Sequence, residues 1–218
     1  MKLFSSMSAK DRMIQQHLIA RGVVDDRVLH AMRSVPRERF VPEESQSEAY
    51  EDCAMSIGHG QTISQPYIVA LMTEKLEPAA GLRVLEVGTG SGYQTAVLAA
   101  LEMQVYTMER VKPLLDETFE RLASLGIKGV RYRFGDGTKG WPEHAPFDRI
   151  LIAAGAPELP RHLLLEQLAD AGVAVLPAGP MEAQSLLQVR RQGPELITKV
   201  LCGVRFVKLV GEGAWDDE

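Results

Sequence analysis

Apolar residues in the first quarter of the chain recur at the three- and four-residue spacing of amphipathic helices. The first such segment carries Met13, Ile14, His17 and Leu18 at helical spacing. Ser8 stands where a helix cap is expected, and Gly22 supplies a stop signal. The pattern therefore predicts a helix between Ser8 and Gly22.

Two more helices are expected before the centre of the chain. Asp25 or Asp26 is suited to cap a short helix that ends before Pro36. Pro66 fits the first position of a helix that runs to about Glu77. Between these helices, residues 41–65 lose all periodicity, and an irregular stretch of this length inside a compact domain is often functional.

Strand-like and helical segments then alternate, which is typical of a parallel sheet with helices on both faces. The expected strands cover residues 82–87, 104–108, 130–134, 148–154 and 172–177. The expected helices cover about 91–101, 112–125 and 159–170. Three consecutive strands without a helix follow and indicate an antiparallel edge, at 184–191, 195–201 and 204–209.

The 218 residues fit one α/β domain, with N-terminal helices and a loop over 1–66 and a doubly wound core over 67–218. The formal net charge of −5 comes from mixed acids and bases without a Lys/Arg-rich block, which argues against nucleic acid or an anionic membrane as a partner. Residues 1–6 lack the apolar run of a secretory signal, and no later run approaches the roughly 20 residues of a membrane span. We expect a cytoplasmic protein.

Two cysteines, Cys53 and Cys202, lie far apart in the sequence. Neither has the paired spacing with histidine or cysteine that zinc sites show, so we expect reduced structural thiols and no metal.

The most informative motif is a glycine loop between a buried-type strand and a helix. It has the spacing G-x-G-x-G over residues 88–92, whereas the dinucleotide fingerprint is G-x-G-x-x-G. Glycines let a ligand approach the backbone closely, and Gly88, Thr89 and Gly90 are the candidate contacts. Alone, such a loop also fits a tight turn without a ligand.

Acidic residues follow the next two strands. Glu109 lies 21 positions after Gly88, near the spacing of a ribose-binding acid, although a solvated strand-end acid is the alternative. Asp136, followed by Gly137, is placed to accept a hydrogen bond from an adenine amino group, or simply to form a turn. These acids would repel phosphate, so the pocket fits a neutral to cationic nucleoside such as S-adenosylmethionine.

Several segments, in order along nearly the whole chain, resemble protein-L-isoaspartate O-methyltransferases. The loop Gln61-Thr62-Ile63-Ser64-Gln65-Pro66 is the specific one, whereas the glycine loop is common to many methyltransferases. The other matching segments are 35–41, 57–60, 91–96, 135–137, 147–148 and 204–207. The resemblance implies a class I methyltransferase fold of the Rossmann type.

The resemblance also implies an activity, protein repair, in which the free α-carboxylate of an L-isoaspartyl residue in a damaged protein or peptide is methylated and the ester collapses to a succinimide. Such a carboxylate has a pKa of about 3.3–3.7, so it is already ionised and needs no general base. Ser64, at the family's active-site position, would orient this carboxylate with help from Thr62, unless both hydroxyls only satisfy backbone groups. His59 would line the cofactor or substrate cleft, with a structural histidine as the alternative.

Other functions remain open on the sequence alone. The alternatives are a class I methyltransferase for a small molecule and a cofactor-binding protein without catalysis, while the glycine spacing disfavours an NAD-dependent dehydrogenase. Lys208 stands where the family pattern has proline, which makes substrate contacts at the C-terminal edge uncertain, as does the acidic tail from Gly213 to Glu218. We expect a monomer. Flanking-sequence preference and turnover rate do not follow from the sequence.

Overall fold

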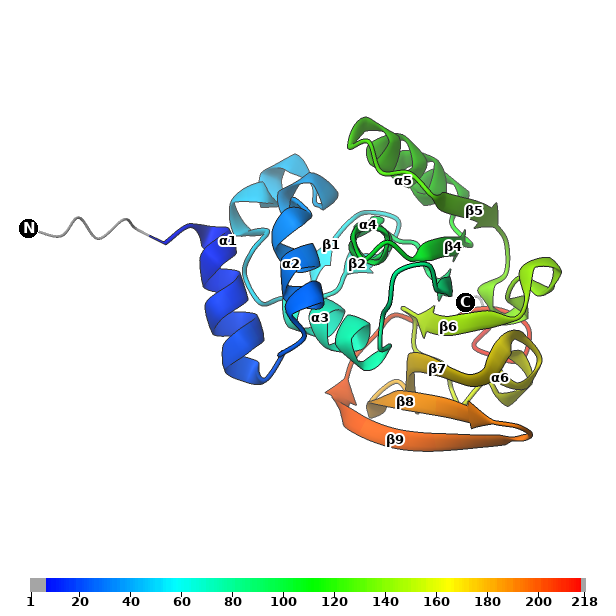
Figure 1. The fold of residues 1–218 in the computed structure, drawn as a ribbon. Coiled ribbons are helices and arrows are strands. Elements are labelled where there is room, and N and C mark those ends of the chain that lie inside the picture. The colour runs from blue at the N-terminus through cyan, green and yellow to red at the C-terminus, as the bar shows by residue number, and fades with distance from the viewer. Residues whose placement is uncertain (1–6, 217–218) are drawn as a thin grey trace, which may run out of the picture.

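The computed structural model describes residues 7–216 and contains a seven-stranded sheet in the order β5-β4-β3-β6-β7-β8-β9 (Figure 1). The strands of this sheet are β3 (Arg83–Val87), β4 (Gln104–Glu109), β5 (Val130–Phe134), β6 (Phe147–Ile152), β7 (Leu168–Ala178), β8 (Gln184–Gln192) and β9 (Glu195–Val204). The helices are α1 (Ala9–Arg12), α2 (Asp26–Ser34), α3 (Pro66–Lys75), α4 (Tyr93–Ala100), α5 (Lys112–Ser124) and α6 (Arg161–Gln167). Residues 1–6, for which we expected no secretory signal, lie outside the described part.

Strands β3 to β7 are parallel, and β8 and β9 add an antiparallel edge. The chain winds outward from β3 to β5 and then returns beside β3 with β6. This reversal creates a switch point between β3 and β6, and open α/β sheets bind ligands at the carboxyl ends of the strands there. The mostly parallel, doubly wound sheet with an antiparallel edge confirms the predicted fold class.

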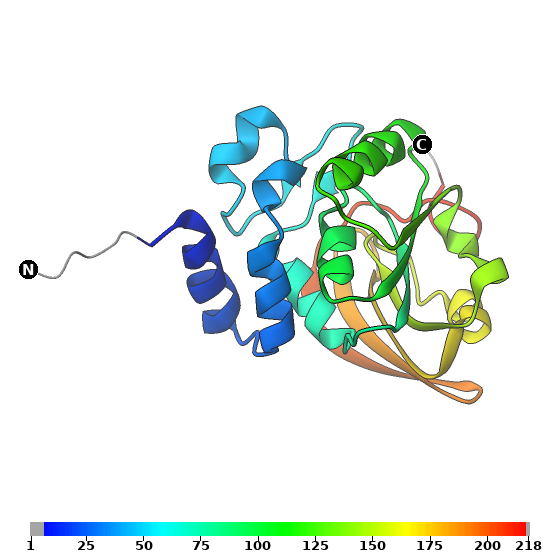
Figure 2. The same cartoon turned by 45° about the horizontal axis from the view of Figure 1, so that its top comes forward.

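Both faces of the sheet are buried, each in its own hydrophobic core. Val84 packs with the N-terminal helices, α3 and α4, whereas its neighbour Leu85 packs with Leu163 and Leu164 of α6 on the opposite face. Alternate strand residues point to opposite faces, so one strand supplies both cores. In Figures 1 and 2 the N-terminal helices lie beside α3 and α4, away from the β8–β9 hairpin. The predicted N-terminal helical layer is therefore present.

Several predicted helix boundaries are confirmed. Ser8 caps α1 by accepting from the backbone N–H of Asp11, and the helix continues as a π segment (Met13–Leu18) and a 3-10 turn (Ile19–Arg21) before Gly22. Asp25 is the N-cap of α2, and Pro66 is the first residue of α3. The predicted division at residue 66 thus coincides with the start of α3, and the division itself remains a prediction.

The region from 41 to 65 is less irregular than expected. It follows a 3-10 turn at Arg37–Phe40 and holds a second one at Glu43–Glu48. It also holds a small antiparallel pair of β1 (Met55–Ser56) with β2 (Thr62–Ile63). Two residues per strand are too few to produce a periodic sequence pattern. The pair fixes the loop that precedes Ser64.

The prediction of a strand at 204–209 is wrong. The hydrogen-bonded strand β9 ends at Val204, and the following residues cross the carboxyl ends of the parallel strands, where Lys208 forms only an isolated bridge with Gly155. The apolar residues there pack against the core without pairing in the sheet, with Phe206 and Leu209 buried. The predicted helix at 159–170 is also shorter, because Leu168 already pairs with Phe147 in the sheet.

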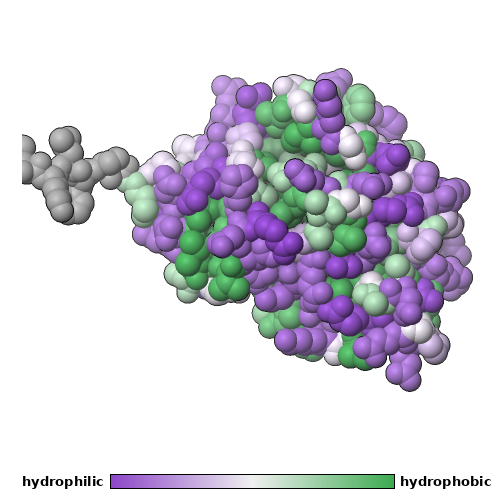
Figure 3. Space-filling view, in the orientation of Figure 1, coloured by the Kyte–Doolittle hydropathy of each residue, from purple (hydrophilic) through white to green (hydrophobic). Residues whose placement is uncertain are grey.

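The face drawn in Figure 3 is mostly hydrophilic, with hydrophobic side chains in separate patches. Within residues 7–216, no helix combines the length and the apolar character needed to cross a membrane.

Candidate functional site

The glycine loop leaves β3 at the switch point and turns into α4. Gly88, Gly90 and Gly92 all have positive φ, at 93°, 52° and 84°. A side chain at Gly92 would also clash, because its Cβ would come within 2.6 Å of Thr118. The sequence therefore folds into a tight loop whose backbone is open to a ligand.

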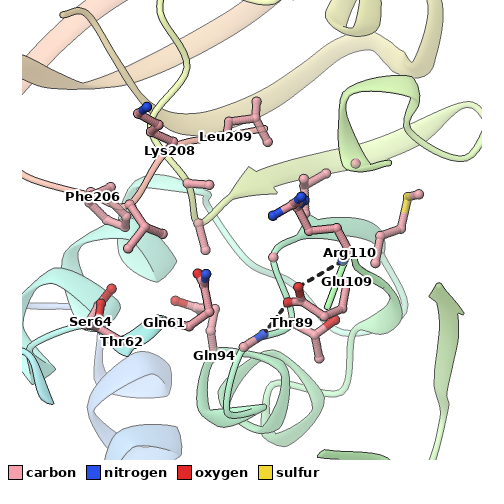
Figure 4. A pocket seen from close by; sticks show the side chains of 18 of the residues that line it. Gln61, Thr62, Ser64, Thr89, Gln94, Glu109, Arg110, Phe206, Lys208 and Leu209 are labelled. Carbon is pink, nitrogen blue, oxygen red and sulfur yellow. Dashed lines mark hydrogen bonds between the residues drawn. The ribbon is translucent and has the colours of Figure 1, made fainter. Parts of the chain in front are cut away.

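Glu109 is the last residue of β4, and its carboxylate accepts a hydrogen bond from this loop. Its Oε2 accepts a 3.0 Å hydrogen bond from the backbone N–H of Gly90 (Figure 4). Its Oε1 accepts 2.9 Å bonds from the N–H groups of Arg110 and Val111. The side chain is buried, at 6% exposure, yet it borders the cavity. A carboxylate has about four acceptor positions, so Glu109 retains capacity for ligand hydroxyl groups.

A chain of hydroxyl groups connects the loop to a second buried acid. Thr89 and Thr107 share a 2.7 Å hydrogen bond, and Thr107 donates to Glu86 Oε2 at 2.6 Å. Thr95 of α4 donates to the same oxygen at 2.5 Å. Burial, with a smaller effect of the Glu109 charge, raises the pKa of Glu86 to about 7. Glu86 thus ties the first helical turn, two strands and the glycine loop together.

A cavity of about 450 Å³ lies over the carboxyl ends of the strands; we call it the main cavity. Figure 4 shows Glu109 on one side of it and Ser64, Thr62 and Phe206 on the other. The structure brings seven of the predicted site residues to its wall. They are Thr62, Ser64, Gly88, Thr89, Gly90, Glu109 and Gly137.

Thr62 lies in β2, and Ser64 is the first residue beyond the end of that strand. Within residues 7–216, neither side-chain hydroxyl makes a hydrogen bond with the protein. This weakens the alternative in which the hydroxyls only satisfy backbone groups. The backbone at Ser64 is anchored instead by Arg37, whose Nη2 donates to the Ser64 carbonyl oxygen at 2.7 Å.

Asp136 is not among the residues that line the cavity. Its Oδ1 accepts from the N–H and hydroxyl of Thr138, and its Oδ2 accepts from the N–H of Glu212 at 3.0 Å. These hydrogen bonds outweigh desolvation and lower the pKa of Asp136. Asp136 therefore fastens the C-terminal segment, while the neighbouring Gly137 lines the cavity and has no room for a side chain, since its Cβ would lie 2.3 Å from Val87.

His59 also lies outside the cavity wall. Its Nε2 is 3.2 Å from Glu117 Oε1 of α5, and its backbone has a positive φ of 52°. The contact links the 57–66 loop to α5, while the adjacent Gly60 and Gln61 do line the cavity.

The sequence reasoning missed several cavity residues. Ala153 and Ala154 follow β6 and line the cavity at the switch point. The predicted strand ran to residue 154 and therefore included them. Ligands in α/β sheets bind just beyond the strand ends at a switch point, and this rule would have indicated both residues. Gln94 is the second residue of α4, which begins directly after the glycine loop. Residues 206–210 and Asp216 reach the cavity only because the last segment crosses the sheet, for which there is no local signal.

Comparison with known proteins identifies the family. A model of the protein-L-isoaspartate(D-aspartate) O-methyltransferase family matches residues 8–214. The chain is 51% identical over 208 residues to protein-L-isoaspartate O-methyltransferase 2 of Pelobacter propionicus, covering 94% of this chain and 92% of that protein. It is 48% identical over 208 residues to the enzyme of Dictyoglomus thermophilum, covering 95% and 94%.

Two solved structures support the same family assignment. A protein-L-isoaspartate O-methyltransferase superposes with a TM-score of 0.84 at 27% identity, over 94% of this chain and 67% of the other. A Plasmodium falciparum protein assigned to the same activity, in complex with S-adenosyl-L-homocysteine, gives 0.80 at 29% identity, over 91% and 96%. With the glycine loop, Glu109 and Ser64 around one cavity, this chain belongs to the protein-L-isoaspartate(D-aspartate) O-methyltransferase family.

Proposed function

We propose that the main cavity is where the methyl group of S-adenosylmethionine passes to the free α-carboxylate of an L-isoaspartyl residue. As a family member, the chain is an S-adenosylmethionine-dependent methyltransferase that acts on isoaspartyl residues in protein repair. The assignment to this cavity rests on one observation: the same cavity is lined by Glu109, beside the glycine loop, and by Ser64. The backbone nitrogen of the following residue then attacks the methyl ester and displaces methanol to form a succinimide, which water partly reopens to normal aspartate.

The residues around the glycine loop fit the cofactor. The Glu109 carboxylate is an acceptor for ribose hydroxyls, and the loop of Gly88, Thr89 and Gly90 allows close approach of the backbone. Met108 and Val87 give the same part of the cavity apolar walls suited to a base. When bound, S-adenosylmethionine supplies a methyl group on a positively charged sulfur.

The protein's own task is to orient the acceptor. The α-carboxylate is ionised at neutral pH, because its pKa is about 3.3–3.7, and it provides the attacking oxygen without a general base. The Ser64 hydroxyl donates a hydrogen bond that fixes one carboxylate oxygen, and Thr62 assists. Buried Ile63 and Phe206 border the same end of the cavity and exclude water from it.

In this proposal His59 and Asp136 position segments of the cavity wall and do not contact the ligands. Asp136, through Glu212, holds the segment that carries Val210 and Asp216 at the cofactor end of the cavity. His59, through Glu117, holds the loop that leads to Thr62. A direct contact of Asp136 with adenine or of His59 with either ligand would require these side chains to leave their present partners.

We further propose that the chain, as one domain, works as a cytoplasmic monomer, without nucleic acid, a membrane surface or a metal. Its mixed surface charge, with a formal net charge of −5, supports the exclusion of polyanionic partners.

The test is methyl transfer from labelled S-adenosylmethionine to matched peptides that differ only in carrying isoaspartyl or aspartyl at one position. We expect base-labile methyl incorporation into the isoaspartyl peptide alone. Incorporation into neither peptide, with S-adenosylmethionine still bound, would favour a cofactor-binding protein or another acceptor. A panel of small carboxylic acids would separate these two.

A further inference from the structure

A second cavity of about 250 Å³ opens beside the main one. The two share five wall residues, among them Thr62, Ser64 and Phe206. The glycine loop and Glu109 line only the main cavity. The second cavity thus adjoins the acceptor end of the site, at Thr62 and Ser64.

An extended polypeptide fits this position. The last residues of β9, Cys202 to Val204, form one wall, and β9 is an edge strand of the sheet. Edge strands present backbone N–H and C=O groups without a strand partner, which an extended peptide can pair with. A residue held at Ser64 therefore has room for its chain neighbours along this wall.

The second cavity has a cationic wall in an acidic protein. Two arginines, Arg21 and Arg205, line it, and among its described lining residues there is no carboxylate. Arg21 forms an ion pair with Asp52 and stacks over the ring of Tyr67, with its guanidinium carbon 3.5 Å from the ring centroid. Arg205 is exposed and, within residues 7–216, makes no hydrogen bond or ion pair.

We propose that the second cavity holds the residues that flank the isoaspartyl residue and that Arg205 makes the enzyme prefer an acidic flank. The inference rests on the proposed function and adds a substrate preference to it. Its physical basis is that Arg21 already has a carboxylate partner, whereas the guanidinium of Arg205 has none among residues 7–216. A substrate carboxylate one or two positions from the reacting residue supplies the missing partner.

The reacting carboxylate is a different group from the one that Arg205 attracts. Arg205 lines the second cavity but not the main cavity, in which the methyl donor is held. The reacting oxygen must lie at Ser64, on the boundary between the two. Neutralising Arg205 should therefore change the ranking of peptides by flank and not the efficiency on all of them equally.

The experiment uses the full chain, S-adenosylmethionine and isoaspartyl peptides with Glu, Gln or Lys on each side of the isoaspartyl residue in turn, each with an aspartyl control. For the wild type, kcat/KM should be about two- to fivefold higher with Glu than with Gln, the range of a solvent-exposed ion pair, and lowest with Lys. In Arg205→Gln the three values should converge, and in Arg205→Glu their order should reverse. Arg161→Gln, an exposed arginine on α6 outside both cavities, should retain the wild-type order.

The preference should also shrink as salt is raised from low ionic strength to about 0.5 M, because exposed charges are screened. Equal kcat/KM on all wild-type isoaspartyl peptides, or a ranking that survives in Arg205→Gln, overturns the inference and leaves the proposed function intact. An equal loss on all peptides in Arg205→Gln would instead assign Arg205 to the reacting carboxylate and also overturn it. Absence of methylation on every isoaspartyl peptide refutes the proposed function itself.

Discussion

The buried guanidinium of Arg37 donates a 2.7 Å hydrogen bond from Nη2 to the backbone carbonyl oxygen of Ser64. Its Nε donates to the carbonyl of Ala49 at 2.7 Å, and the guanidinium carbon lies 4.8 Å from the centroid of the Tyr93 ring. Tyr93 is the first residue of α4, directly after the glycine loop. The Arg37 side chain therefore connects the loop that carries the Ser64 hydroxyl to α4, the helix that follows the glycine loop.

Replacing Arg37 by lysine should reduce kcat/KM for isoaspartyl peptide by about tenfold or more, since a single ammonium cannot reproduce the two directed hydrogen bonds. Thermal unfolding should show reduced stability as well. Arg39→Lys, at an exposed neighbouring arginine, is the control. Because a purely structural defect would also lower activity, the deciding measurement is a double-mutant cycle with Ser64→Ala. We expect the two losses in kcat/KM to be non-additive, and simple addition would show that Arg37 does not act through Ser64.

Ser64→Ala alone should lower methyl transfer by roughly ten- to a hundredfold, the value of one hydrogen bond to a charged group. Affinity for S-adenosylhomocysteine and the unfolding temperature should stay near wild type, as in the control Ser47→Ala on an exposed turn. Steady-state kinetics and calorimetry provide both readouts. Wild-type turnover of the alanine variant would remove the orienting role.

Glu109→Gln keeps the size of the side chain but removes the charge that faces the cavity. We expect the dissociation constant for S-adenosylhomocysteine to rise by about ten- to a hundredfold, because hydrogen bonds to a charged group are worth roughly 1.5–3 kcal/mol. Calorimetry measures it directly, with Glu120→Gln on the exposed face of α5 as the control. An unchanged affinity would place the ribose elsewhere.

Glu86 should make the protein less stable as the pH rises toward neutrality. Its pKa in the folded protein, about 7, lies above the reference value of 4.5, so the folded state holds a proton that the unfolded chain has lost. The stability from this group is complete below pH 4.5 and declines up to about pH 7, by at most about 1.4 kcal/mol per pH unit. The difference in unfolding free energy between wild type and Glu86→Gln should follow this slope in denaturant titrations. A difference independent of pH would show that Glu86 ionises normally.

A chelator should leave the rate of methyl transfer unchanged. The nucleophile is ionised without help, and the sulfonium loses its methyl group to become the neutral thioether of S-adenosylhomocysteine, so the reaction needs no Lewis acid. Activity lost with chelator and restored by one particular metal would contradict this expectation.

Local patterns predicted the glycine loop and Glu109 because strand, turn and helix follow one another directly in the sequence. The role of Arg37 had no such signal, since its carbonyl partners are 12 and 27 residues away and a charged residue is normally expected at the surface. Asp136 shows the same limit, because its link to Glu212 spans 76 positions. The error at 204–209 arose because a short apolar segment can pack against the core in an extended form whether or not it pairs in a sheet.

The C-terminal segment has a practical consequence for handling the enzyme. Trp215 donates from Nε1 to the carbonyl of Gly155, Val210 bridges Trp215, and Asp216 lines the main cavity. A purification tag fused after residue 218 would begin three positions beyond the cavity-wall residue Asp216, close enough to compete with the cofactor for the main cavity. A tag fused before α1, which lies at the opposite side of the molecule in Figure 1, avoids that interference.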